Sequence, residues 1–155
     1  MKINYQYPVV VKTVVDGDTL KLDMDLGFGI WKLNQSFRLV ATDAPEIHSD
    51  NPLEVQAGLA VKSFVTTLMC PEACKPAIKT MVESHELDKY GRVLGEIYTP
   101  RGEALSRLLL DMKAVKAYSG AKKPLWTTDE LNAVLQSVMF MTTAMLKSEL
   151  QEVKK

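Results

Sequence analysis

The sequence is poor in the residues from which zinc sites and disulfide frameworks are built. It has two cysteines and two histidines among 155 residues. Because a structural zinc site needs four such ligands close together, these scattered residues do not predict one. A disulfide between Cys70 and Cys74 would form only if the turn between them brought their Cα atoms close. We expect two free thiols, as is usual in a reducing compartment.

The chain also lacks net charge and long apolar runs. Its 19 lysines and arginines balance 19 aspartates and glutamates. A neutral chain is not expected to bind polyanions indiscriminately, so any phosphate site must be local. No run of about 18 apolar residues is present, and the N-terminal stretch lacks the apolar core and cleavage site of a signal peptide. We therefore expect an intracellular protein without a membrane partner.

What is present fits one globular domain over residues 1–155. A chain of this length can bury a sizeable core, and 46% hydrophobic and 25% charged residues are ordinary proportions. We find no internal repeat, low-complexity segment or linker. The sequence therefore predicts a single domain.

The first 40 residues have the pattern of β-strands. Residues 9–15 are rich in β-branched side chains, and residues 19–26 alternate apolar and polar side chains with a period of two. Asp16 and Gly17 form a tight-turn pair between these segments. After a glycine-containing turn, residues 30–40 form a third segment. The pattern predicts a three-stranded meander.

Helical periodicity begins after residue 50. Thr127 and Glu130 have the spacing of a capping box, which marks the start of a last helix. The predicted segments are a helix from Glu54 to about Pro71, strands at 77–83 and 92–98, and helices at 103–112 and about 128–152. Five strands with a helix between the third and the fourth is the order of an OB-fold. We predict an α+β fold, a five-stranded OB-fold β-barrel with three helices.

The last predicted helix is apolar on every side at Val138–Met141. A helix that covers a core needs only one apolar stripe. The surplus indicates either a contact between two copies of the chain or deeper burial under the loop at 122–126. We therefore expect a monomer or a homodimer formed through this helix.

The stretch FRLVATDAPE, residues 37–46, ends in an unusual way for a strand. It presents two acids, Asp43 and Glu46, on either side of a proline that stiffens the backbone and frees the carbonyl of Ala44 from the sheet. Two carboxylates and a carbonyl suit a hard cation such as Ca²⁺. Arg38 on the same strand adds a guanidinium, which together with a metal recognises phosphate. The alternative is a solvated strand end with a structural arginine.

Three short motifs follow one another along the chain: DGDT at 16–19, FRLVATDAPE at 37–46 and DKYGR at 88–92. Each is weak alone, but in this order and on this strand pattern they resemble the staphylococcal (micrococcal, thermonuclease-like) nuclease family. The resemblance covers about residues 9–118. It implies a metal-dependent phosphodiesterase that uses Ca²⁺ to hydrolyse DNA and RNA, prefers single strands and leaves 3′-phosphates.

The resemblance also implies metal ligands, catalytic groups and substrate contacts. They are Asp18, Asp43 and the carbonyl of Ala44 for one Ca²⁺; Arg38, Glu46 and Arg92 for catalysis; and Lys89, Tyr90 and Tyr118 for the nucleotide. The two arginines would grip the scissile phosphate, and the glutamate would position or deprotonate the attacking water. Two carboxylates suffice because phosphate and water complete the shell of 6–8 oxygens that Ca²⁺ takes.

The sequence departs from the family in places. Threonine is common where Ala44 stands, but a carbonyl ligand tolerates that change. The best-known members are strongly basic and exported, whereas this chain is neutral and has no visible export signal. The alternative function is a catalytically weak OB module that binds nucleic acid or protein. The retained acids and arginines favour the enzyme.

Overall fold

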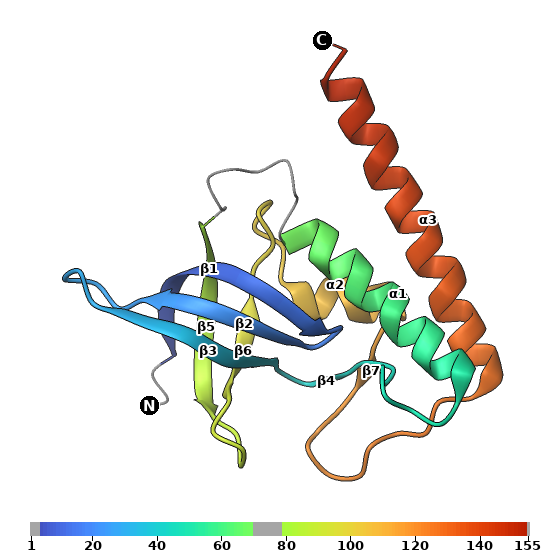
Figure 1. The fold of residues 1–155 in the computed structure, drawn as a ribbon, viewed down its shortest axis with the longest axis horizontal. Coiled ribbons are helices and arrows are strands. Elements are labelled where there is room, and N and C mark those ends of the chain that lie inside the picture. The colour runs from blue at the N-terminus through green and yellow to red at the C-terminus, as the bar shows by residue number, and fades with distance from the viewer. Residues whose placement is uncertain (1–3, 70–78, 155) are drawn as a thin grey trace.

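The computed structural model describes residues 4–69 and 79–154, which form a β-barrel flanked by helices (Figure 1). Both cysteines, Pro71 and the predicted start of the fourth strand lie outside the described residues. The elements are β1 (Tyr5–Asp16), β2 (Thr19–Asp25), β3 (Trp31–Leu39), β4 (Thr42–Asp43), α1 (Pro52–Met69), β5 (Lys79–Leu87), β6 (Val93–Ile97), α2 (Leu105–Asp111), β7 (Lys116–Ala117) and α3 (Thr128–Glu152). In this part of the chain no helix is long and apolar enough to cross a membrane.

Five strands close into one barrel in the order β1-β2-β3-β6-β5. Neighbouring strands are antiparallel except β3 and β6, which are parallel. The predicted meander and the predicted α+β OB-fold with a five-stranded barrel and three helices are confirmed. Alternation along the strands sends large apolar side chains inward, among them Val9, Leu20, Leu22, Phe37, Leu39, Val82 and Ile97.

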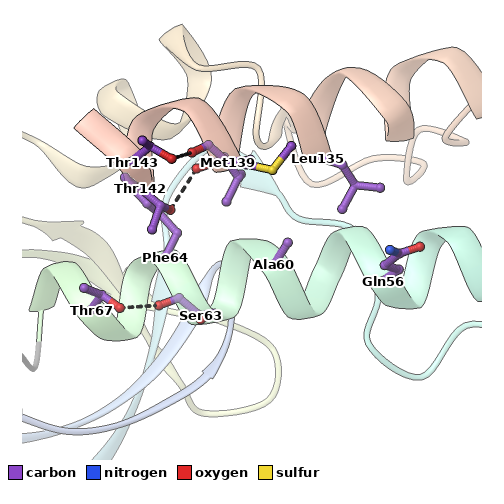
Figure 2. Close-up of a pocket in the computed structure, with 10 residues that line it drawn as sticks. Gln56, Ala60, Ser63, Phe64, Thr67, Leu135, Met139, Thr142 and Thr143 are labelled. Atoms are coloured by element: carbon purple, nitrogen blue, oxygen red, sulfur yellow. Dashed lines mark hydrogen bonds between the residues drawn. The ribbon is translucent and has the colours of Figure 1, made fainter. Parts of the chain in front are cut away.

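The helix α1 contacts both the barrel strand β1 and the helix α3, which lies beside it (Figure 1). Between the two helices runs a groove of about 430 Å³. Figure 2 shows Ala60 and Phe64 of α1 on one side of this groove, and Leu135 and Met139 of α3 on the other. None of the candidate site residues lines this groove, so the candidate site lies elsewhere in the structure.

The helix α3 has the predicted bounds and begins with the predicted capping box, in which Thr127 and Glu130 exchange hydrogen bonds. Within its apolar turn Val138 is buried, but Met139 and Phe140 are 67% and 73% exposed. The predicted deeper burial under the loop at 122–126 is therefore wrong for these two side chains. Their apolar surface faces solvent in the single chain.

A small sheet of β4 and β7 was not predicted. Thr42 pairs with Ala117 and Asp43 with Lys116, and the N–H of Tyr118 donates to the carbonyl of Ala41 at 3.0 Å. Two-residue strands leave no periodic signal in a sequence. Their pairing brings the segment before α3 against residues 43–46, which we call the acidic turn.

Close backbone packing holds the acidic turn on α1. A Cβ atom at Gly58 of α1 would lie 2.5 Å from the carbonyl oxygen of Pro45. A Cβ at Gly17, in the β1–β2 turn, would lie 2.6 Å from Cγ1 of Val61 and 2.9 Å from Cβ of Ala44. Contacts this short leave no room for a side chain. Both turns can therefore pack against α1 only because glycine stands at these positions.

We expect Gly58→Ala to destabilise the protein, although alanine is the better helix former by about 1 kcal/mol. The new methyl group would meet the Pro45 carbonyl, and overpacking of this kind costs about 1–3 kcal/mol. Urea denaturation measures the free energy of unfolding. Ser63→Ala, at an exposed position of the same helix, is the control and should be neutral or slightly stabilising. A Gly58→Ala protein as stable as this control would contradict the packing argument.

Candidate functional site

Three charged side chains from separate segments are buried at one end of β3. Asp18 follows the β1–β2 turn, Arg38 lies on β3 and Asp43 on β4, and their exposed fractions are 6%, 8% and 2%. Burial of charge is costly unless each group is paired, so their contacts decide what the cluster can do.

Asp18 joins the β1–β2 turn to β3 and to the acidic turn. Its Oδ2 accepts the N–H of Ala44 at 2.8 Å and lies 2.7 Å from Nη1 of Arg38. Its Oδ1 accepts the hydroxyl of Thr19 at 3.1 Å, and its carbonyl accepts the N–H of Leu39 at 2.8 Å. The carboxylate is therefore fixed by backbone and by charge.

Arg38 is held on the other side by backbone carbonyls. Its Nη2 donates to the carbonyl of Thr42 at 2.8 Å and lies 3.9 Å from Oδ1 of Asp43. Its Nη1 is 3.4 Å from the carbonyl of Asp18. A guanidinium bound in this way keeps a fixed orientation, and its contact with phosphate stays a prediction.

Asp43 has a buried oxygen, Oδ1, that accepts no hydrogen bond within the described part of the chain. Two cations lie near it: Nζ of Lys123 at 3.4 Å and Arg38. Lys123 also donates a hydrogen bond to Glu46 Oε1. Partial burial lowers the pKa of Lys123, but Glu46 and Asp43 outweigh this and raise that pKa above its ordinary value. No partner was predicted for Lys123, because no local pattern connects it to a turn so distant in the sequence.

The loop that carries Lys123 is anchored at both ends. At its start β7 pairs with β4, and at its end the Thr127 cap begins α3. Nζ of Lys116 binds the carbonyl of Leu125 at 2.8 Å and Oε2 of Glu130 at 2.7 Å. In Figure 1 this loop runs below β4 and β7 before it reaches α3.

The second candidate group is the DKYGR turn. Asp88 accepts the backbone N–H of Tyr90 at 2.8 Å and of Arg92 at 3.0 Å, and its Oδ2 lies 2.6 Å from Nε of Arg92. Partial burial acts to raise the pKa of Asp88, but the hydrogen bonds from Arg92 outweigh this and lower that pKa below its ordinary value. Arg92 was predicted to grip the scissile phosphate, and no partner within the protein was predicted for it. In the structure its Nε pairs with Asp88.

The exposed ring of Tyr90 lies beside two cations. Nζ of Lys89 is 5.1 Å and the guanidinium of Arg92 is 5.4 Å from the ring centroid. The three side chains therefore lie together, and their contact with a nucleotide stays a prediction. Tyr118 lies apart from them, after β7, and its hydroxyl donates to the carbonyl of Ala121 at 3.3 Å.

The β3–β6 register relates the two arginines. Arg38 pairs with Leu94, and Arg92 stands two residues before Leu94. Because side chains alternate along a strand, Arg38 and Leu94 point away from the core side chains of Phe37 and Val93, and Arg92 stands one residue before β6 begins. The joint contact of Arg38 and Arg92 with one phosphate stays a prediction.

The oxygens of the acidic turn fit a hard cation. The buried Asp43 Oδ1 accepts no hydrogen bond from the described residues, and Nζ of Lys123 and Nη2 of Arg38 lie 3.4 and 3.9 Å from it. No three histidine, cysteine, aspartate or glutamate side chains gather as a metal-binding cluster in that part of the chain. Binding of a cation to Asp18, Asp43 and the Ala44 carbonyl stays a prediction.

A family model described as "Staphylococcal nuclease homologue" matches residues 36–146. The chain belongs to this family. The match spans the acidic turn, the DKYGR turn and Lys123, whereas Asp18 lies before it and is connected to the site by its contacts with Arg38 and Ala44. A search of the curated proteins finds no match. Membership of the staphylococcal nuclease family confirms the resemblance and supports a nuclease-like protein.

Burial raises the pKa of Asp18 from 3.8 to about 7. Desolvation of the charged form is the largest cause, and the neighbouring Asp16 adds to it, while Arg38 and the N–H of Ala44 act in the opposite direction. Between pH 4 and 7 the folded protein therefore binds more protons at Asp18 than the unfolded chain does. Folding stability falls as the pH rises through this window.

We expect the free energy of unfolding, measured in chelator, to decline between pH 5 and 7. Asp18→Asn should flatten this decline, by at most about 1.4 kcal/mol per pH unit, the value of one titrating proton. The slope is the readout, because the loss of the Arg38 partner changes absolute stability at every pH. Asp50→Asn, at an exposed position, is the control. Equal slopes in all three proteins would contradict the assignment.

Proposed function

We propose that the protein is a Ca²⁺-dependent nuclease that hydrolyses phosphodiester bonds of DNA and RNA and prefers single strands. The observation that carries the proposal is the buried set of Asp18, Arg38 and Asp43, with Asp43 Oδ1 accepting no hydrogen bond from the described residues. Membership of the staphylococcal nuclease family, which is generally calcium-dependent, supports it.

Three groups would hold the ion: the carboxylates of Asp18 and Asp43 and the carbonyl of Ala44. The ion, when bound, would supply positive charge against the phosphate and a place for water. Glu46 follows Asp43 closely and keeps about half of its side chain exposed, at 47%. Its carboxylate is therefore partly open to solvent, although it also accepts a hydrogen bond from Lys123, and we assign it as the base for the attacking water.

The reaction needs one proton acceptor and donors for the phosphate. The water oxygen bonds to phosphorus while its proton passes to Glu46, and the bond between phosphorus and the leaving 5′ oxygen breaks. The 5′ oxygen then takes up a proton, which leaves a 3′-phosphate and a 5′-hydroxyl. Arg38 and Arg92 would bind the phosphate oxygens and oppose the charge that grows in the transition state.

The exposed side chains around the site suit a nucleotide. The ring of Tyr90 is 71% exposed and offers a face on which a base or sugar can stack. Lys89 and Arg92 beside this ring add positive charge. Tyr118, placed next to the acidic turn by the β4–β7 pairing, is the third proposed contact. Because these contacts are few, we infer a short binding site in keeping with a neutral chain.

We expect labelled single-stranded DNA to be cut with Ca²⁺ and to stay intact in excess chelator. Glu46→Gln should lower turnover about 10²–10⁴-fold, the usual contribution of a general base, and leave Ca²⁺ binding nearly unchanged. Glu149→Gln, at an exposed position of α3, is the control. Cleavage in chelator, or Glu46→Gln turnover within threefold of wild type, would contradict the proposal. Binding of DNA without cleavage under any metal would favour the alternative, a binding module.

We expect Arg92→Lys to lower turnover about 10²–10³-fold, because lysine keeps the charge and loses the planar pair of donors. The melting temperature should change little, since the Arg92–Asp88 pair is partly exposed and such pairs contribute about 0–1 kcal/mol. The matched control is Arg107→Lys, because Arg107 forms an exposed pair of the same spacing with Asp111. Near-normal turnover with a lowered melting temperature would show that Arg92 is structural.

A further inference from the structure

Lys123, in the loop before α3, contacts the carboxylates of Asp43 and Glu46. In the proposed function Asp43 binds the metal ion and Glu46 accepts a proton from the attacking water. Nζ of Lys123 is 3.4 Å from Oδ1 of Asp43 and donates a hydrogen bond to Oε1 of Glu46. The side chain of Asp43 is 3% exposed, whereas that of Lys123 is 54% exposed. The ammonium therefore approaches a buried carboxylate from the solvent side.

The ammonium and a divalent ion cannot use Asp43 Oδ1 together. Ca²⁺ binds carboxylate oxygens at about 2.3–2.6 Å. An ion at that distance and Nζ of Lys123 at its present position would be like charges a few ångströms apart, around one oxygen. Arg38, whose Nη2 lies 3.9 Å from the same oxygen, adds further positive charge. Lys123 therefore has to withdraw before the oxygen can bind the ion.

The contacts of Lys123 are of a kind that can be broken. Its approach to Asp43 Oδ1 does not form a hydrogen bond, so it is held there by charge. Its pair with Glu46 is half exposed on both sides, and such pairs are weak because water screens them. Withdrawal needs only a rotation of the lysine side chain into solvent.

The backbone that carries Lys123 returns the ammonium to the same place. The pairing of β7 with β4 and the contacts of Lys116 with Leu125 and Glu130 fix the loop on either side. A competitor tethered in this way is present at constant effective concentration and cannot be diluted away.

We propose that Lys123 is a tethered cation that competes with Ca²⁺ for the acidic turn and so sets the metal affinity of the site. The proposal rests on the proposed function, because it takes Asp43 as a metal ligand. An apparent dissociation constant rises by the inverse of the fraction of molecules that are free to bind. If the ammonium covers Asp43 about nine-tenths of the time, its removal tightens Ca²⁺ binding about tenfold.

The test is calorimetric titration of metal-free wild type, Lys123→Met and Lys122→Met with Ca²⁺. Methionine keeps the aliphatic length and removes the charge. Lys122 is exposed and adjacent, so its variant measures the general effect of losing one positive charge from the loop. We expect Lys123→Met to lower the dissociation constant about tenfold, and Lys122→Met to lower it by less than about threefold, as an exposed, screened charge does. Equal constants for the two variants, or weaker binding by Lys123→Met, would overturn the proposal.

The reactivity of the lysine amines gives an independent readout. Wild type is treated briefly with an acetylating reagent with and without Ca²⁺, and modification of Lys122 and Lys123 is followed by mass spectrometry. We expect Ca²⁺ to increase modification of Lys123 and to leave Lys122 unchanged, because the ion releases the ammonium into solvent. An unchanged or reduced reactivity of Lys123 would overturn the competition.

The two proposals fail in different ways. If none of the three proteins binds Ca²⁺, the metal assignment of the proposed function fails and the competition fails with it. If wild type binds Ca²⁺ and cuts single-stranded DNA in a Ca²⁺-dependent manner, but Lys123→Met does not bind more tightly than Lys122→Met, only the role of Lys123 is rejected.

Discussion

The buried ion pair between Asp18 and Arg38 is the contact on which the site depends. Nη1 of Arg38 lies 2.7 Å from Oδ2 of Asp18, and each side chain is about nine-tenths buried. A buried pair offsets much of the cost of desolvating two charges, but loss of one partner leaves the other uncompensated. The remaining donors and acceptors of the pair bind the backbone of Thr42 and Ala44. One pair therefore positions the β1–β2 turn, β3 and the acidic turn relative to one another.

Burial also leaves two carboxyl groups of the site without full compensation by their partners. The carboxyl of Asp18 has a pKa raised to about 7 by burial, and Asp43 keeps an oxygen that accepts no hydrogen bond among the described residues. A strongly perturbed carboxyl such as that of Asp18 is typical of functional sites. A cation would relieve both groups, and the ammonium of Lys123 provides part of that relief in the present structure.

Much of the fold could be predicted from the sequence, because period and capping are local signals. The alternation at 19–26 became β2, and the capping box at Thr127 marked the start of α3. The β4–β7 pairing, and with it the place of Lys123, could not be predicted, because it depends on contacts between segments far apart in the chain. The pair of Arg92 with Asp88 was not predicted either, although both residues lie in one short turn. The acidic turn was predicted as a candidate site, but the burial of Asp43 was not predicted.

We propose that Asp18, Asp43 and the Ala44 carbonyl form a divalent-cation site, and that Arg38 and Arg92 bind the phosphate next to it. The most direct measurement is a crystal structure of the protein grown with Ca²⁺, with the ion located by its anomalous scattering at long wavelength. We expect one peak within about 2.3–2.6 Å of both carboxylates, with the Lys123 ammonium displaced from Asp43. An ion bound elsewhere, or an acidic turn still covered by Lys123 at a Ca²⁺ concentration that supports cleavage, would contradict the account.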